Sequence, residues 1–443
     1  MLFPLYVTPF EQSLLVDDRP AYPWNIVSRL TLAGPLDRDA LARAWMKALA
    51  RQPMLRAKLV RRGRGVRWIE AEDSPPIRWN EHPRGAWPRM THIDLFTRGP
   101  VDLWCTTEGE HTELTLHLHH VNTDGMGTVQ FWGDLLALYA AECGHSVSPP
   151  PVEEKLLRRR DRYGLTVLRF LKYAPKLAIG ILGAKDFMNR KAAECTPHQP
   201  VPFGDELPAT YPAALTHVLT TEETTQALAA AKRAGVTLND LLARDLFLAL
   251  GAWRDARGLV DDQAWLRMMI PMNLRGPDDA AMPVANIMST IFLDRQRPEL
   301  AAPQTLLASI REQMNLIKNN RLALIWVIAL KLVSFLPGQM QKQADGQGTV
   351  ATTILTNLMR PFAALYLPRD AAQRVIAGGL TLERFEVYAP LRPGTCVTFG
   401  VATYAGRLHL CFQYDPRVLS QVEAEELLTR FAEQVRRSGN AAA

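Results

Sequence analysis

Two adjacent histidines, His119 and His120, precede an aspartate and a glycine, Asp124 and Gly125, at the end of a strand-like run. An imidazole titrates near neutral pH, so it can take up and release a proton during a reaction. A carboxylate four residues later can cap the next helix or pair with an arginine that fixes the loop. These residue types at this spacing are suited to general acid–base catalysis at a turn.

The two histidines are not equivalent. In HTELTLHLHH (111–120), side chains alternate between two faces, so His120 shares a face with three leucines and His119 points the other way. For a sheet with one buried side, we expect partial desolvation to lower the pKa of His120 and to keep its ring neutral near pH 7. Gly125 is expected to supply the backbone conformation that takes the chain from the strand into the next helix.

The surrounding chain alternates between strand and helix patterns, which is typical of a mixed α/β protein. Asp37 or Asp39 is the expected cap of a helix that ends near residue 53, and Thr237 or Asn239 of one that ends near residue 258. Because 443 residues exceed one typical domain, we expect two similar lobes. The expected boundaries are 1–150 for the first lobe, 151–205 for a connecting segment and 206–443 for the second lobe.

The connecting segment is strongly basic. Between residues 155 and 191, eleven lysines and arginines accompany only two aspartates, with apolar residues interleaved. Such a segment fits a solvated crossover helix between the lobes, or a peripheral contact with an anionic membrane surface. No stacking aromatic series or known binding motif accompanies the charge, so we expect no nucleic acid partner.

Composition narrows the function little. A net charge of +6 is compatible with acidic small molecules, acidic proteins or anionic lipids and selects none of them. The five cysteines show no CxxC spacing, so we expect no metal site, no disulfide framework and a cytoplasmic location. The first residues lack the pattern of a secretory signal. The longest apolar run, 322–336, is interrupted by Lys331 and predicts a buried helix.

The stretch HHVNTDG (119–125) resembles the HHxxxDG motif of an acyltransferase superfamily. That superfamily includes chloramphenicol acetyltransferases, nonribosomal peptide synthetase condensation domains, polyketide-associated acyltransferases and bacterial wax ester synthases. Other segments resemble its further motifs in the expected order: RQPMLRAKL (51–59), TLNDLLARDLFLAL (237–250), IPMNLRG (270–276), ANIMSTIFL (285–293), LTNLMRPFAALYLP (355–368) and YAGRLHLCFQYDP (404–416). Gln52 stands where relatives often have histidine.

The resemblance implies an α/β fold of two chloramphenicol-acetyltransferase-like mixed-sheet lobes that form a pseudo-dimer, with an active-site tunnel between them. It makes His120 the general base and gives His119 and Gly125 supporting roles. Asp124 is expected to form a structural salt bridge with Arg56, or otherwise with Arg275.

The same resemblance points to groups that stabilise the oxyanion or contact substrate. Ser289 or Thr290 is the first candidate for a hydroxyl donor, and Asn273 is a weaker one. Arg275 is a further candidate for a contact with the oxyanion or the substrate. A hydroxyl that packs between strands is the alternative interpretation of Ser289 and Thr290.

The implied reaction moves an acyl group from a thioester to the hydroxyl of a small-molecule acceptor and gives an ester. The donor is acyl-CoA or an acyl carrier protein thioester, and no tightly bound cofactor is expected. Two alternatives remain: a stand-alone condensation domain that forms an amide from a carrier-bound donor, and a catalytically silent lipid-binding or scaffold protein. Residues 155–191 are the expected place of any peripheral membrane contact.

Overall fold

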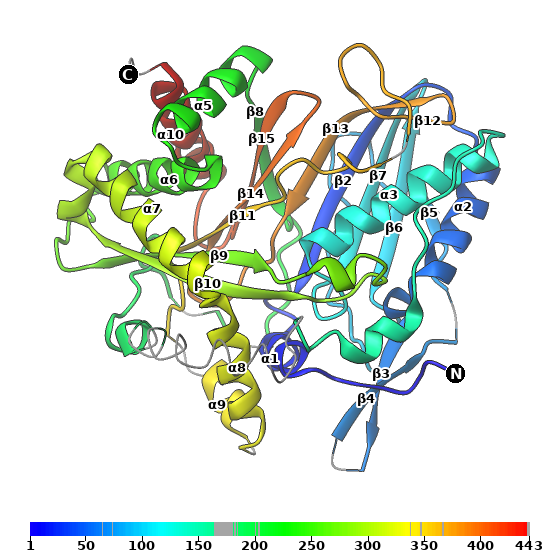
Figure 1. The fold of residues 1–443 in the computed structure, drawn as a ribbon, viewed down its shortest axis with the longest axis horizontal. Coiled ribbons are helices and arrows are strands. Elements are labelled where there is room, and N and C mark those ends of the chain that lie inside the picture. The colour runs from blue at the N-terminus through cyan, green and yellow to red at the C-terminus, as the bar shows by residue number, and fades with distance from the viewer. Residues whose placement is uncertain are drawn as a thin grey trace.

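The computed structural model describes residues 1–63, 65–72, 74–163, 180, 183, 185–199, 201–202, 204–336, 338–345, 348–365 and 367–440. This part of the chain forms two six-stranded mixed sheets and one three-stranded sheet, with helices packed on them (Figure 1). The predicted α/β fold with two lobes is confirmed.

The N-terminal sheet carries the two histidines. Its strands, in spatial order, are β12 (Ile376–Ala377), β13 (Leu380–Tyr388), β2 (Asn25–Ala33), β7 (His111–His119), β6 (Val101–Glu108) and β5 (Ile77–Trp79). Helices α2 (Arg38–Arg51) and α3 (Gly125–Glu142) pack against it (Figure 1). Asp37, one of the two expected residues, caps α2 by accepting a hydrogen bond from the backbone N–H of Ala40.

The C-terminal sheet consists of β10 (Met288–Gln296), β9 (Trp265–Asn273), β11 (Thr353–Asn357), β14 (Val397–Tyr404), β15 (Arg407–Tyr414) and β8 (Ala213–Val218). Its core is shared with α5 (Thr221–Arg233), α6 (Leu238–Asp255), α7 (Pro303–Asn320) and α10 (Gln421–Asn440). These helices gather on the side of the molecule opposite to α2 and α3 (Figure 1). Thr237, the first of the two expected residues, caps α6.

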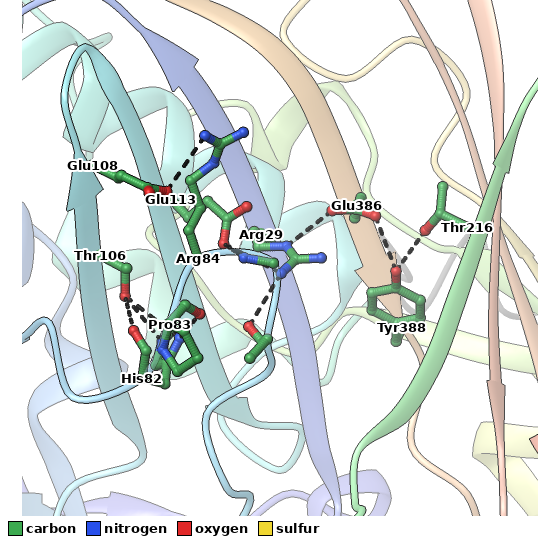
Figure 2. Close-up of polar contacts among 12 residues, drawn as sticks. Arg29, His82, Pro83, Arg84, Thr106, Glu108, Glu113, Thr216, Glu386 and Tyr388 are labelled. Atoms are coloured by element: carbon green, nitrogen blue, oxygen red, sulfur yellow. Dashed lines mark hydrogen bonds and ion pairs between the residues drawn. The ribbon is translucent and has the colours of Figure 1, made fainter.

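Two strands from the C-terminal half, β12 and β13, belong to the N-terminal sheet. Strand β13 pairs antiparallel with β2, so residues 376–388 lie in the first lobe's sheet although they follow the expected boundary at 206. A buried polar network fastens this junction (Figure 2). Arg29 of β2 forms an ion pair with Glu386 of β13 at 3.0 Å. Tyr388 donates to Glu386 and contacts Thr216 of β8 at 2.6 Å, so the network reaches the second sheet.

The three-stranded sheet contains β1 (Leu5–Tyr6), β4 (Gly65–Glu70) and β3 (Ala57–Arg62). Near it, helix α1 (Pro9–Asp17) supplies Glu11, which forms a fully buried ion pair with Arg160 at 2.6 Å. Arg160 thus holds the start of the basic segment against the protein interior. Residues 164–179, 181–182 and 184, which include much of the expected membrane contact, lie outside the described residues.

The apolar run 322–336 forms α8 (Ala323–Ser334), which is followed by α9 (Gln339–Asp345). Its buried side chains include Leu324, Val327 and Leu330, whereas Leu332 and Phe335 are exposed. The prediction of a buried helix is therefore correct for one face only. Among the helices in the described part of the chain, none combines the length and apolar composition needed to cross a bilayer.

Candidate active site

Strand β7 ends at His119, and His120 begins the turn that leads into α3. The three leucines of β7 are buried against α2 and α3, as the alternation predicts. The opposite face of β7 is buried too, since His117 and His119 are at most 1% exposed. The expectation of one buried side was therefore wrong. Trp104 packs on His117 at 4.4 Å between ring centroids, and burial lowers the pKa of His117 to about 3.

The ring of His120 is held in one tautomer. Its Nδ1 lies 2.8 Å from the carbonyl oxygen of Thr123. A carbonyl oxygen only accepts hydrogen bonds, so Nδ1 carries the hydrogen and Nε2 keeps its lone pair. Burial lowers the pKa of His120, which favours the neutral ring near pH 7. The side chain can therefore accept a proton at Nε2.

The backbone N–H and the backbone carbonyl of His120 both form hydrogen bonds. Its N–H donates to the carbonyl of Trp24 at 2.6 Å, and its own carbonyl accepts from Asn286 Nδ2 at 2.6 Å. The Trp24 ring lies edge-on to the imidazole, with 5.7 Å between centroids. Because Trp24 precedes β2 and Asn286 precedes β10, both lobes contribute to the position of His120.

Asp124 caps α3 and binds the second lobe at the same time. Its Oδ1 accepts from the backbone N–H of Gly127 at 2.8 Å. Its Oδ2 accepts from Arg275 Nη1 at 2.7 Å and from the backbone N–H of Ile287 at 2.8 Å. The carboxylate is 3% exposed. This arrangement fixes the turn that holds His120, and it combines the two roles considered for Asp124 from the sequence.

Arg56, the preferred partner of Asp124, is not the residue that binds it. Arg56 instead forms an ion pair with Glu70 at 2.5 Å and donates to the carbonyl of Leu49 at 3.2 Å. The reason lies in the strand pairing, because β3 begins directly after Arg56 and sets Ala57 opposite Glu70. Arg275, the fallback, forms the salt bridge and also donates to the carbonyl of Ala285 at 2.8 Å.

The segment before Arg56 supports the histidine turn in another way. Asn122 donates through Nδ2 to the carbonyl of Met54 at 2.8 Å. Gln52 accepts through Oε1 from the backbone N–H of Val284 at 2.6 Å and donates to Asp134 at 2.7 Å. The glutamine that departs from the superfamily pattern therefore ties α2 and α3 to the loop before β10.

Gly125 provides space for a neighbouring side chain rather than a positive φ. Its φ is not among the positive values of the chain. A Cβ at this position would lie 2.8 Å from Cδ2 of Leu358, so a side chain would force Leu358 to move. The expected reason for Gly125 was therefore wrong, and the glycine instead permits close approach between α3 and the segment after β11.

The three oxyanion candidates lie in the paired strands β9 and β10. Ser289 is fully buried, and its hydroxyl donates to the carbonyl of Ala323 at 2.5 Å, which attaches β10 to α8. Thr290 is 8% exposed and pairs in register with Pro271 of β9. Asn273 accepts through Oδ1 from Arg275 Nη1 at 3.2 Å. Among the described residues, none of these hydrogen bonds or strand pairings links Ser289, Thr290 or Asn273 to His120. Their role in binding the oxyanion stays a prediction.

His119 is fully buried and faces Asp18, which no sequence pattern indicated. The His119 Nε2 atom lies 3.2 Å from Asp18 Oδ2, and His92 Nε2 lies 2.7 Å from the same oxygen. Burial alone would raise the pKa of Asp18, but the two histidines hold it well below its usual range. Burial alone would lower the pKa of His92, but its hydrogen bond to Asp18 and the attraction of that carboxylate raise it.

The raised pKa of His92 predicts a pH-dependent contribution to stability. The stabilisation from protonated His92 is complete at pH values below 6.5, the ordinary pKa of histidine. It is lost as pH rises through the higher pKa that His92 has in the folded protein. His92→Gln should therefore lower the free energy of unfolding by more at pH 5.5 than at pH 8.5, with a difference of about 1 kcal/mol at most. Urea unfolding at both pH values measures it, with the exposed His145→Gln as control. An equal effect at the two pH values would contradict the assignment.

Sequence reasoning missed Asp18, Trp24 and Asn286. The signal for the first two is the pairing of Asn25 opposite His119, which brings the residues before β2 beside the histidine turn. That pairing joins segments far apart in the sequence and is not visible in local periodicity. Asn286 lies in the quoted stretch ANIMSTIFL, but its bond to the His120 carbonyl depends on how the two lobes dock.

Comparison with known proteins gave no match to a family model and none to a curated protein. Solved structures do match over nearly the whole chain. The first condensation domain of the calcium-dependent antibiotic (CDA) synthetase is 16% identical with a TM-score of 0.70, covering 100% of this chain and 97% of that one. A mutant starter condensation domain of rhizomide synthetase, in complex with C8-CoA and Leu-SNAC, is 14% identical with a TM-score of 0.67, covering 99% and 95%.

A third similar structure is the polyketide synthase associated protein 5 of Mycobacterium tuberculosis. It is 16% identical, has a TM-score of 0.63, and the match covers 98% of each chain. At this identity the likeness establishes the fold. The chain therefore folds as condensation domains do, with two mixed-sheet lobes of the chloramphenicol acetyltransferase type.

Proposed function

We propose that this protein is an acyltransferase that moves an acyl group from a thioester to an acceptor hydroxyl, with His120 as the general base. The observation that carries the proposal is the tautomer of His120. Thr123 accepts the Nδ1 hydrogen at 2.8 Å, which leaves Nε2 as a proton acceptor on a ring whose pKa burial lowers. The fold shared with condensation domains supports acyl transfer as the reaction class.

In the proposed reaction, His120 Nε2 takes the proton of the acceptor O–H as the oxygen attacks the thioester carbonyl carbon. A C–O bond forms, and the resulting tetrahedral oxyanion then breaks the C–S bond. The departing thiolate receives the proton from Nε2, which returns the neutral imidazole. Asp124 and Arg275 take no proton; their 2.7 Å ion pair keeps the turn in the position that the transfer requires.

The donor that we favour is acyl-CoA, because the related rhizomide synthetase domain was crystallised with C8-CoA. We propose that donor and acceptor reach His120 from opposite faces, through a tunnel between the lobes. Both lobes contribute contacts to the backbone of His120, through Trp24 and Asn286, which supports a site at their junction.

Amide formation is the second candidate function. The similar structures include condensation domains of peptide synthetases, and one contains Leu-SNAC, a small thioester with an amino group. An amine acceptor would lose its proton to the same Nε2 atom. The two functions thus differ in the acceptor and in the carrier of the donor, not in the base.

The test presents octanoyl-CoA and octanoyl-loaded acyl carrier protein to the full chain, each with 1-octanol or leucine amide. Free thiol and product mass are measured for wild type and His120→Ala. Thiol release that requires an alcohol and gives an ester supports the first proposal. Release only from the carrier protein, with an amide product, supports the second. No acceptor-dependent difference between wild type and His120→Ala would favour a catalytically silent protein.

A further inference from the structure

The turn between α1 and β2 holds a buried carboxylate with three partners. Asp18 is 7% exposed in its side chain, and its Oδ2 contacts His92 Nε2 at 2.7 Å and His119 Nε2 at 3.2 Å. Its Oδ1 accepts from the backbone N–H of Trp24 at 3.0 Å. A buried carboxylate that accepts hydrogen bonds from His92 and from the Trp24 backbone is fixed in place, so the groups around it are fixed relative to one another.

Two of these partners flank His120. His119 is its chain neighbour, and the His119 ring accepts through Nδ1 from the backbone N–H of Val121 at 3.3 Å, on the far side of His120. Trp24 accepts the backbone N–H of His120 at 2.6 Å and lies edge-on to its ring. Asp18 is therefore linked to His120 through two sets of contacts. One includes the His119 ring, and the other includes the backbone of Trp24.

The tautomer of His119 depends on the same carboxylate. Because Nδ1 accepts from Val121, it carries no hydrogen, and a neutral ring must then have its hydrogen on Nε2. The carboxylate oxygen Oδ2 of Asp18 lies 3.2 Å from this Nε2 atom, and its negative charge favours the hydrogen there. An ionised carboxylate accepts and cannot donate, so Asp18 selects the one neutral tautomer of His119 that can also accept from Val121.

The turn is itself fastened to the C-terminal half. Asp17 forms an ion pair with Arg392 at 3.0 Å. Arg417 donates to the carbonyl of Ala21 at 3.0 Å and lies over the Tyr22 ring at 4.6 Å. The turn thus has a fixed position from which Asp18 can act on the histidines.

We propose that Asp18 is a positioning residue for the acyl transfer, which sets the direction of His120 Nε2 through the His119 ring and through Trp24. The proposal rests on the proposed function of His120 as the base. Asp18 itself touches neither substrate nor the reacting atoms. Loss of its acceptor oxygen frees the turn around His120 and displaces Nε2 from the acceptor hydroxyl.

The kinetic test uses Asp18→Asn in the full chain, with octanoyl-CoA and 1-octanol. We expect kcat to fall about tenfold to a hundredfold, as for a displacement of the base near 1 Å, with KM for octanoyl-CoA little changed. The matched control is Asp102→Asn, a carboxylate 5% exposed on the strand beside β7, ion-paired with Arg98 at 2.7 Å. The control should leave kcat unchanged. An equal loss in both variants would overturn the proposal.

The second readout is ¹⁵N NMR of the histidine side chains, which does not require substrate. In wild type, His119 should carry its hydrogen on Nε2. In Asp18→Asn, the amide can donate to Nε2, so the hydrogen should move to Nδ1. An unchanged tautomer would overturn the proposal. If instead His120→Ala transfers acyl groups as fast as wild type, the proposed function fails. The NMR result still shows whether Asp18 determines the tautomer of the His119 ring.

A conservative variant separates positioning from folding. Asp18→Glu keeps the charge and the acceptor oxygens but displaces them by one methylene. It should retain the wild-type tautomer of His119 and recover part of the rate that Asp18→Asn loses. A glutamate variant that folds but is no faster than the asparagine variant would show a purely structural role and would overturn the proposal.

Discussion

His120→Ala is expected to lower kcat for acceptor-dependent thioester cleavage by about a hundredfold to ten-thousandfold, the range of a positioned general base. The alanine removes Nε2, the atom left free by the bond between Nδ1 and Thr123. Without it, the acceptor hydroxyl must lose its proton to water. The measurement is the initial rate of thiol release from octanoyl-CoA with 1-octanol, at saturating concentrations of both.

The control for that experiment is His145→Ala, an exposed histidine beyond the end of α3, which should retain the wild-type rate. His120→Ala should also unfold close to the wild-type temperature, because both backbone bonds of residue 120 remain. A loss of rate that merely follows a loss of folded protein, or a rate within tenfold of wild type, would contradict the role of His120.

Arg275→Ala is the second large effect, and it concerns stability. Its partner Asp124 is 3% exposed, so the substitution leaves a buried carboxylate without its counter-ion. Such a loss lowers the free energy of unfolding by about 3–5 kcal/mol. It should also lower kcat, because Asp124 fixes the turn that begins at His120. Urea unfolding at pH 7 provides the measurement.

Arg56→Ala is the matched control, because superfamily resemblance favoured this arginine. Its ion pair is with Glu70, which is 53% exposed, so its removal should change stability by about 1 kcal/mol or less. The two variants therefore test which arginine holds Asp124. A larger loss in Arg56→Ala than in Arg275→Ala would contradict the assignment.

Local sequence signals predicted the elements well where burial and capping are local. The alternation in β7 places its leucines against α2 and α3. Each of the two predicted pairs of cap residues includes the residue that caps the helix, Asp37 for α2 and Thr237 for α6. The same reasoning placed β13 in the second lobe. The pairing of β13 with β2 depends on contacts such as Arg29 with Glu386, which join residues hundreds of positions apart.

The site was predicted less completely than the fold. The sequence identified the turn at His120 and Asp124, since the motif is contiguous. It ranked the arginines in the wrong order, because the direction of Arg56 is set by the pairing of β3 with β4. It missed Asp18 and Trp24, because their contacts arise only when β2 lies beside β7. The contiguous motif thus indicated the candidate base, and long-range strand pairing determines which residues hold it in place.

The pH dependence of kcat/KM for octanoyl-CoA cleavage tests the central claim most directly. If neutral His120 is the base, the rate should fall on acidification along a one-proton limb with an apparent pKa below 6.5, since burial lowers the pKa of this ring. That limb should disappear from the residual activity of His120→Ala. A limb with an apparent pKa above 6.5, or one that survives in His120→Ala, would contradict the claim.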